Sequence, residues 1–361
     1  MKIVKLFVLC LMLSLCCNVF AQTNYASTIE YDKTIDKLIP KAKKNKLSEK
    51  QLLSFTNSYH EANQNDHQRI MELKKSGQPD IWIEIYHRIN SINSRQNKIK
   101  TLPDNIKIAM NFKMLDLDAE IENSKEKAEL YICAKSNFLL KDINEDNLKE
   151  VESLVNQLAK INPQSANLDD LRLKLVILPS KYILFRIATP TELHLPGNFA
   201  QLALQFDDNT IFGIPFDIVP DENKEYDLMI CVMIEEKYVS PERVTTATFE
   251  ETNGDKVAIV TDITQSKSAQ IIGQIEFFDV KNERIKLSTP FDIASTFVHH
   301  YAEIDGDSTA CSEHTIELIK MQQVDFPSDD ALFKDVARKL NHVIKTHYQK
   351  KIKNNKKVCV E

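Results

Sequence analysis

The stretch AQIIGQIEFFDV, residues 269–280, decides the fold class of the second half of the chain. It is rich in apolar and β-branched residues over a length typical of a strand, and DVKNERI at 279–285 predicts a hairpin turn after it. Four other runs have the same character: KYILFRIAT (181–189), YDLMICVMIEE (226–236), KVAIVTDIT (256–264) and FVHHYAEI (297–304). Residues 179–350 therefore predict an α+β domain whose strands are mainly antiparallel.

Helices are also expected within this domain, two of which bear on its packing. PGNFAQLALQF, from Pro196, predicts a short helix capped at Asn198. Near the end, Ser328 is a good N-cap, and the acidic residues after it suit the first turn of a helix. An apolar stripe follows, so this last helix should pack on the sheet: Phe333, Val336, Leu340, Val343 and Ile344.

Residues 22–178 predict a helical domain. Ser48 and Gln51 form a capping-box pattern before one helical run, and a second run ends at Gly77. A third begins after Pro79 and carries a stripe in which Trp82 is a core anchor: Trp82, Ile85, Tyr86, Ile89 and Ile92. The connection 101–115 is ambiguous, with a short strand as one interpretation, and further helices are expected at 117–140, 146–161 and 166–178.

The junction INPQSANLDD, after the helix at 146–161, is typical of tetratricopeptide repeats. Such repeats need small residues where paired helices touch, but this chain has Val151, Leu154 and Leu158 at the corresponding positions. The prediction is therefore helical hairpins of a repeat-like type.

The first 21 residues predict a secretory signal peptide. Lys2 and Lys5 precede an apolar core from Leu6 to Cys17, which is too short to cross a bilayer, and Val19-Phe20-Ala21 suits cleavage before Gln22. The alternative is a lipid anchor at Cys16 or Cys17, although the residues before them do not fit a bacterial lipobox. The mature chain, which has no later apolar segment of spanning length, is expected in the periplasm or cell envelope.

Composition excludes several function classes. Only six glycines occur in 361 residues, and the chain has no GxGxxG, Walker, HExxH, CxxC, GxSxG or EF-hand pattern. A net charge of −6 argues against general nucleic-acid binding. The basic tail, 351–361 with Lys350 before it, is either a solvated helix end or a contact with an anionic surface.

Four cysteines follow the predicted signal peptide. Cys133 and Cys231 lie in apolar runs and are expected to be buried, whereas Cys311 and Cys359 lie in polar surroundings and form a possible disulfide.

The stretch HHYAEIDGDSTACSEH, 299–314, is the one candidate metal site. Cys311 and His314 are spaced to share a helix face, but His299 and His300 alternate across a strand, so at most one of them can join. The competing interpretation is a strand, a turn at Asp305-Gly306-Asp307 and a helix that begins at Ser312. We favour the second interpretation, with no metal and no cofactor.

Several segments in order resemble an uncharacterised family of exported bacterial envelope proteins. They are LKKSGQPDIWIEIY…RQNKIK, EYDLMICVMIEEKYVSPERV, QSKSAQIIGQIEFFDV, YAEIDGD, the AC before a helix, and FPSDDALFKDVARKL. YDLMICVMI and GQIEFFDVKNERI are also distantly similar to domains of envelope-assembly lipoproteins, such as the curli-secretion pore subunit and the lipoprotein activators of penicillin-binding proteins. The resemblance implies an accessory or assembly role, no described active site, and a packing role for Cys311 beside Ala310.

The sequence thus predicts a non-enzymatic exported protein that binds a protein partner in the cell envelope, through a groove between the helical hairpins. The alternative is a metal-dependent hydrolase that uses His314, Cys311 and one of His299 and His300. The oligomeric state is left open.

Overall fold

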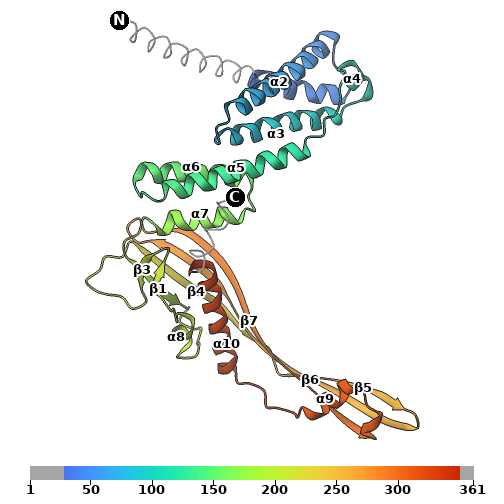
Figure 1. Ribbon diagram of the computed structural model, residues 1–361, viewed down its shortest axis with the longest axis vertical. Helices are drawn as coiled ribbons and strands as arrows, with labels where there is room; N and C mark the ends of the chain where they lie inside the picture. Colours follow the sequence, from blue (N-terminus) through green and yellow to red (C-terminus); the bar gives the residue numbers. More distant parts are fainter. Residues whose placement is uncertain (1–27, 350–361) are drawn as a thin grey trace. The chain divides into compact units, whose positions relative to one another are not determined.

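The computed structural model describes residues 28–349 of the chain (Figure 1). The predicted signal peptide, Cys16, Cys17, the basic tail and Cys359 lie outside these residues. Contacts divide the described chain into a helical unit, residues 28–141 and 149–168, and a sheet unit, residues 142–148 and 169–349. The fold class is α+β, as predicted.

The helical unit is an array of antiparallel helices with short connections. They are a helix over residues 28–43, then α2 (Glu49–Ser76), α3 (Ile81–Lys100), α4 (Asp104–Ala109), α5 (Asp118–Leu139) and α6 (Glu145–Ile161). The capping box at Ser48 is present, and Gly77 ends α2 at φ 65°, where glycine is favoured. These caps confirm two sequence predictions.

Two predictions for this unit are wrong. The two helical runs before Gly77 form one continuous helix, α2, because the polar residues between them do not break helical structure. The strand considered within 101–115 does not form, since this segment holds the short helix α4 after Pro103.

The apolar stripe of α3 is buried as expected. Ile85, Ile89 and Ile92 pack with residues of α2, and Trp82 is partly buried against them. The ammonium of Lys127 lies 4.0 Å from the centroid of the Trp82 ring. Trp82 is therefore a packing residue of the helical unit.

The boundary between the units falls at α7 (Ala166–Ile177). The sequence grouped this helix with the helical part, but Leu173, Val176 and Ile177 belong to the core of the sheet unit.

The sheet unit has one seven-stranded sheet. Its strands are β1 (Ile183–Ala188), β2 (Thr210–Ile211), β3 (Ile214–Asp217), β4 (Leu228–Val239), β5 (Arg243–Asn253), β6 (Lys256–Asp279) and β7 (Arg284–Gly306). Its helices are α8 (Phe199–Ala203), η1 (Ser308–Ala310), α9 (Glu313–Lys320), α10 (Asp329–Ile344) and η2 (Lys345–Gln349). The sheet is mainly antiparallel, and β1 pairs in parallel with β3 and β4.

β6 is the central strand of a long ribbon, because it pairs with other strands on both of its edges. One of its edges pairs with β7 along almost its whole length, and the other pairs with β5 over residues 256–266 and with β4 over residues 269–279. The runs 256–264 and 269–280, predicted as two strands, are thus one strand of 24 residues. β5 was not predicted at all.

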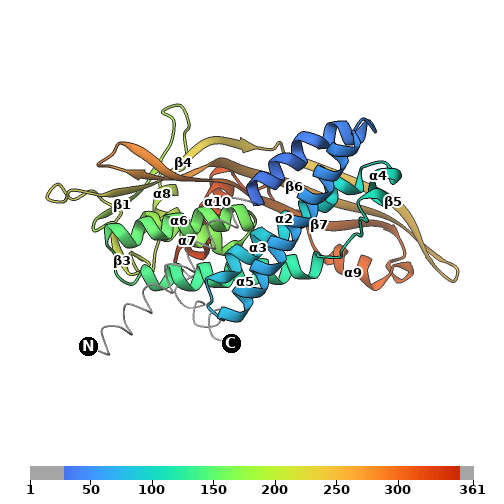
Figure 2. The same ribbon diagram turned by 90° about the horizontal axis from the view of Figure 1, so that it is seen from above.

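α10 packs on one face of the inner part of this sheet. Ser328 caps it, and its buried side chains join those of β4, β6 and α8 in one apolar core. Figures 1 and 2 both show the ribbon extending beyond α10 to a tip formed by β5 and the outer parts of β6 and β7, beside α9. The predicted packing of the last helix on the sheet is confirmed.

Candidate functional site

The helical unit contains a groove of about 550 Å³. Its lining comes from the first helix, α2, α3, α5 and α6: Thr28, Ile29, Asp32, Asp66, Asp80, Ile83, Glu84, His87, Arg88, Ser91, Arg95, Tyr131, Leu154 and Gln157. Its volume is within the range of small-molecule and peptide sites, and its lining combines charged side chains with a few apolar ones, Ile29, Ile83 and Leu154.

The floor of the groove is a buried pair of opposite charges. Arg95 on α3 and Asp66 on α2 are each 2% exposed, and Arg95 Nη2 donates to Asp66 Oδ2 at 2.7 Å. Arg95 Nε also donates to Asp32 Oδ1 at 2.6 Å, and Arg88 Nη1 donates to Asp66 Oδ1 at 2.7 Å. Both oxygens of Asp66 are therefore occupied by guanidinium groups.

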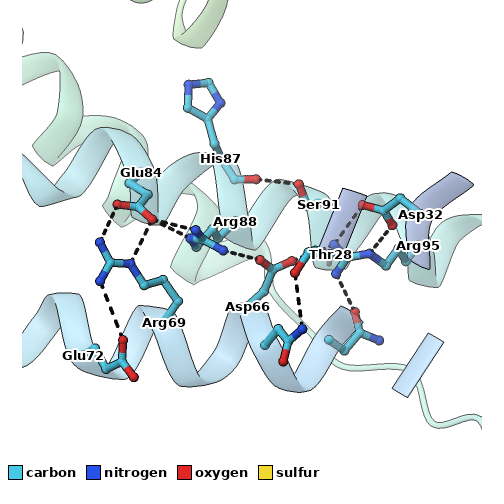
Figure 3. Close-up of polar contacts among 12 residues, drawn as sticks. Thr28, Asp32, Asp66, Arg69, Glu72, Glu84, His87, Arg88, Ser91 and Arg95 are labelled. Carbon is cyan, nitrogen blue, oxygen red and sulfur yellow. Dashed lines mark hydrogen bonds and ion pairs between the residues drawn. The ribbon is translucent and has the colours of Figure 1, made fainter. Parts of the chain in front are cut away.

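The network continues toward the surface along α3 (Figure 3). Arg88 Nε donates to Glu84 Oε1 at 2.8 Å, and Arg69 reaches both oxygens of Glu84 at 3.1 and 3.2 Å. The result is an alternating row of guanidinium groups and carboxylates across three helices. Each charge has an opposite neighbour, which offsets the cost of burying it.

The electrostatics of the row follow from this pairing. Burial alone would lower the pKa of Arg95, but its bonds to Asp32 and Asp66 outweigh burial and raise that pKa. Burial would raise the pKa of Glu84, but hydrogen bonds from Arg69 and Arg88 hold that pKa below its ordinary value. Both shifts favour the charged forms of Arg95 and Glu84.

One carboxylate of the groove lies outside this row. Asp32, Asp66 and Glu84 are paired with the guanidinium groups of Arg95, Arg88 and Arg69. The exposed Asp80, by contrast, lines the groove and has no ion pair among the described residues. The groove thus carries one unpaired negative charge at its rim.

Residues typical of nucleophilic catalysis do not converge among the described lining residues. Ser91 Oγ donates to the backbone carbonyl of His87 rather than to its ring, and in Figure 3 that ring points away from the charged row. Ser91 thus has no imidazole base within hydrogen-bond reach, which a serine nucleophile needs.

The sequence did not reveal this site, although a signal was present. Arg95 lies three residues after Ile92 and four before Ile99, within the stripe that α3 buries. A charged residue on a buried helix face requires a partner from another helix, and Asp66 on α2 is that partner.

The histidines named in the sequence are separated by the fold. His299 Nε2 lies 2.7 Å from the backbone O of Gln322, and His300 Nε2 lies 2.5 Å from Asp262 Oδ1. Because these two histidines are adjacent on β7, their side chains take opposite faces.

Cys311 and His314 lie elsewhere, at the start of α9. Ser312 beside them bonds to Glu251, which pairs with Ala258 of β6, whereas His300 pairs with Thr264. Six strand positions separate these points, or about 20 Å at about 3.3 Å per residue. Among residues 28–349 no group of three or more His, Cys, Asp or Glu side chains could hold a metal ion.

Cys311 is half-buried and unbonded to another cysteine within the described chain. Burial raises the pKa of its thiol, and the neighbouring carboxylates of Glu251 and Asp307 raise this pKa further. A thiol with a raised pKa is a poor nucleophile and a poor metal ligand. Cys133 and Cys231 are buried, as predicted.

No protein-family model matches this chain, and no curated protein is similar to it in sequence. The helices of the described part of the chain include none long and apolar enough to cross a membrane.

Proposed function

We propose that this chain is a non-enzymatic exported protein of the cell envelope, whose helical unit binds a positively charged segment of a protein partner. The observation that carries the proposal is the unpaired Asp80 carboxylate at the rim of a groove of about 550 Å³, beside the apolar side chains of Ile83 and Leu154. The resemblance to envelope proteins, carried by the segments quoted above, favours an accessory or assembly role.

The chemistry of the groove selects the ligand. The guanidinium groups at its floor already have carboxylate partners, so an anionic ligand would have to displace them. A lysine or arginine side chain can instead approach Asp80 at the rim, while Ile83 and Leu154 receive an apolar neighbour. A short peptide that alternates basic and apolar residues has this character.

The first experiment measures binding of labelled hexapeptides to the full chain by fluorescence anisotropy. We expect a peptide of alternating leucine and lysine to bind, and its leucine–glutamate counterpart to bind at least about tenfold more weakly. Asp80→Asn should weaken the lysine peptide about three- to tenfold. Asp118→Asn, an exposed aspartate in the first turn of α5 outside the groove, is the matched control.

Equal binding of the two peptides, or equal effects of the two substitutions, would contradict the proposal. A photo-cross-linking residue at Ile83 in living cells then tests for a natural partner. Ile108, 78% exposed and outside the groove, is the control position.

A further inference from the structure

β5 is an exposed edge strand. It pairs only with β6 among the described strands, and every residue from Arg243 to Glu250 is exposed. In an antiparallel sheet every second residue of an edge strand turns its backbone N–H and C=O groups away from its one neighbour. β5 therefore offers a free row of hydrogen-bonding groups along its outer side.

The sequence of β5 gives this edge little protection. RVTTATFEETN contains no proline and no lysine, and it is rich in β-branched residues, which suit further pairing. Its charged residues are Arg243, Glu250 and Glu251, of both signs. A second copy of opposite direction can therefore place these charges against one another.

The same sequence complements itself in one antiparallel register. If a two-fold axis normal to the sheet passes through Ala247, residues equally far from it in the two copies face each other. Arg243 then faces Glu251, and Val244 faces Glu250, each on a common face of the sheet. The remaining pairs are Thr245 with Phe249 and Thr246 with Thr248.

Neighbouring registers lack this complementarity. Moving the axis to Thr248 places Thr246 against Glu250 and Thr245 against Glu251, and leaves Arg243 opposite Asn253. Moving it to Thr246 places Arg243 against Phe249. Arg243 forms no ion pair within the described chain. Glu251 accepts hydrogen bonds from Ser312 and Thr315 there but pairs with no cationic side chain, so its charge can still attract Arg243 of a second copy.

We propose that β5 pairs antiparallel with β5 of a second copy of this chain, about a two-fold axis through Ala247, to form a continuous six-stranded tip. The interface is small, and interfaces well below about 1,200 Å² are weak. The dimer therefore forms at high local concentration and dissociates on dilution.

Sedimentation velocity of the full chain over a concentration series tests the proposal. We expect a reversible monomer–dimer equilibrium, and slower hydrogen exchange of residues 243–253 at high concentration than at low concentration. Arg243→Glu, which places like charges opposite Glu251, should raise the dimer Kd about three- to tenfold, while Arg338→Glu on exposed α10 should not.

Substitutions of Val244, which is 54% exposed, test the register and leave the core intact. Val244→Lys adds a charge opposite Glu250 and should lower the dimer Kd, whereas Val244→Glu should raise it, each about threefold or more. A chain that stays monomeric at every concentration, or a dimer that responds equally to the two substitutions, would overturn the proposal.

Discussion

At the scale of single residues, the helical unit depends on a few buried charges. Asp66 lies between two guanidinium groups, so neither its charge nor theirs is left alone in the interior. Removing one partner of such a group is far more damaging than removing an exposed ion pair, because the remaining charge stays buried.

Arg95→Met should therefore destabilise the helical unit by about 3–5 kcal/mol. Lys98→Met, on the same helix, breaks an exposed pair with Asp36 and should cost less than about 1 kcal/mol. Urea unfolding followed by fluorescence measures this difference, since Trp82 is the only tryptophan and lies in this unit. Similar costs for the two variants would mean that the buried row is not a stabilising feature.

A second residue-scale prediction concerns acid. Burial would raise the pKa of Asp279, but hydrogen bonds from Lys286 and Asn282 outweigh burial and hold it well below the ordinary value. A depressed folded-state pKa stabilises the fold fully above the unfolded value, about pH 4, and this contribution is lost as the pH falls further.

Asp279→Asn should thus cost about 2 kcal/mol at pH 6 and measurably less at pH 3, where the unfolded chain is already protonated but the folded carboxylate is still largely ionised. Chemical denaturation followed by circular dichroism at the two pH values measures this loss of unfolding free energy. Asp305→Asn, at an exposed position of β7, is the control. A cost that does not change with pH would show that the carboxylate charge is not what stabilises the turn.

At the scale of elements, Gly273 determines how closely the three strands of the ribbon approach. A Cβ atom there would collide with the backbone O of Met233 on β4 and lie 2.8 Å from Phe291 Cζ on β7. The register of β4 against β6 also shifts beside this point, between Ile234 and Glu236. A residue without a side chain is required where the neighbouring strand bends over β6.

Gly273→Ala should therefore destabilise the sheet unit by about 3 kcal/mol. Gly197→Ala is the matched control, because a Cβ atom there meets nothing within 4 Å. Thermal unfolding followed by circular dichroism compares the two variants. If both melt like the unsubstituted chain, the strands can separate more easily than the geometry indicates.

At the scale of the whole molecule, the sequence predicted the fold class, most helices and the last helix on the sheet, because caps and apolar periodicity are local signals. It missed β5, since each residue from Arg243 to Glu250 is exposed and no apolar pattern marks the strand. It divided β6 because polar residues interrupt an apolar run, although Gln265 and Lys267 are buried with partners on the segment after α9. The charged groove was missed because it joins residues distant in sequence.

The two-residue turn at Gly254-Asp255, which joins Asn253 to Lys256, also has a kinetic consequence. A hairpin with a short loop forms in about 1–10 μs, whereas the parallel pairing of β1 with β4 must first close a long connection. The ribbon should therefore begin to fold at this turn. The pairing of strands should then extend from β5 and β6 to β7 and β4. During that interval its outer strand is already complete while the core beneath α10 is still open, so early intermediates should be the species most prone to associate through β5.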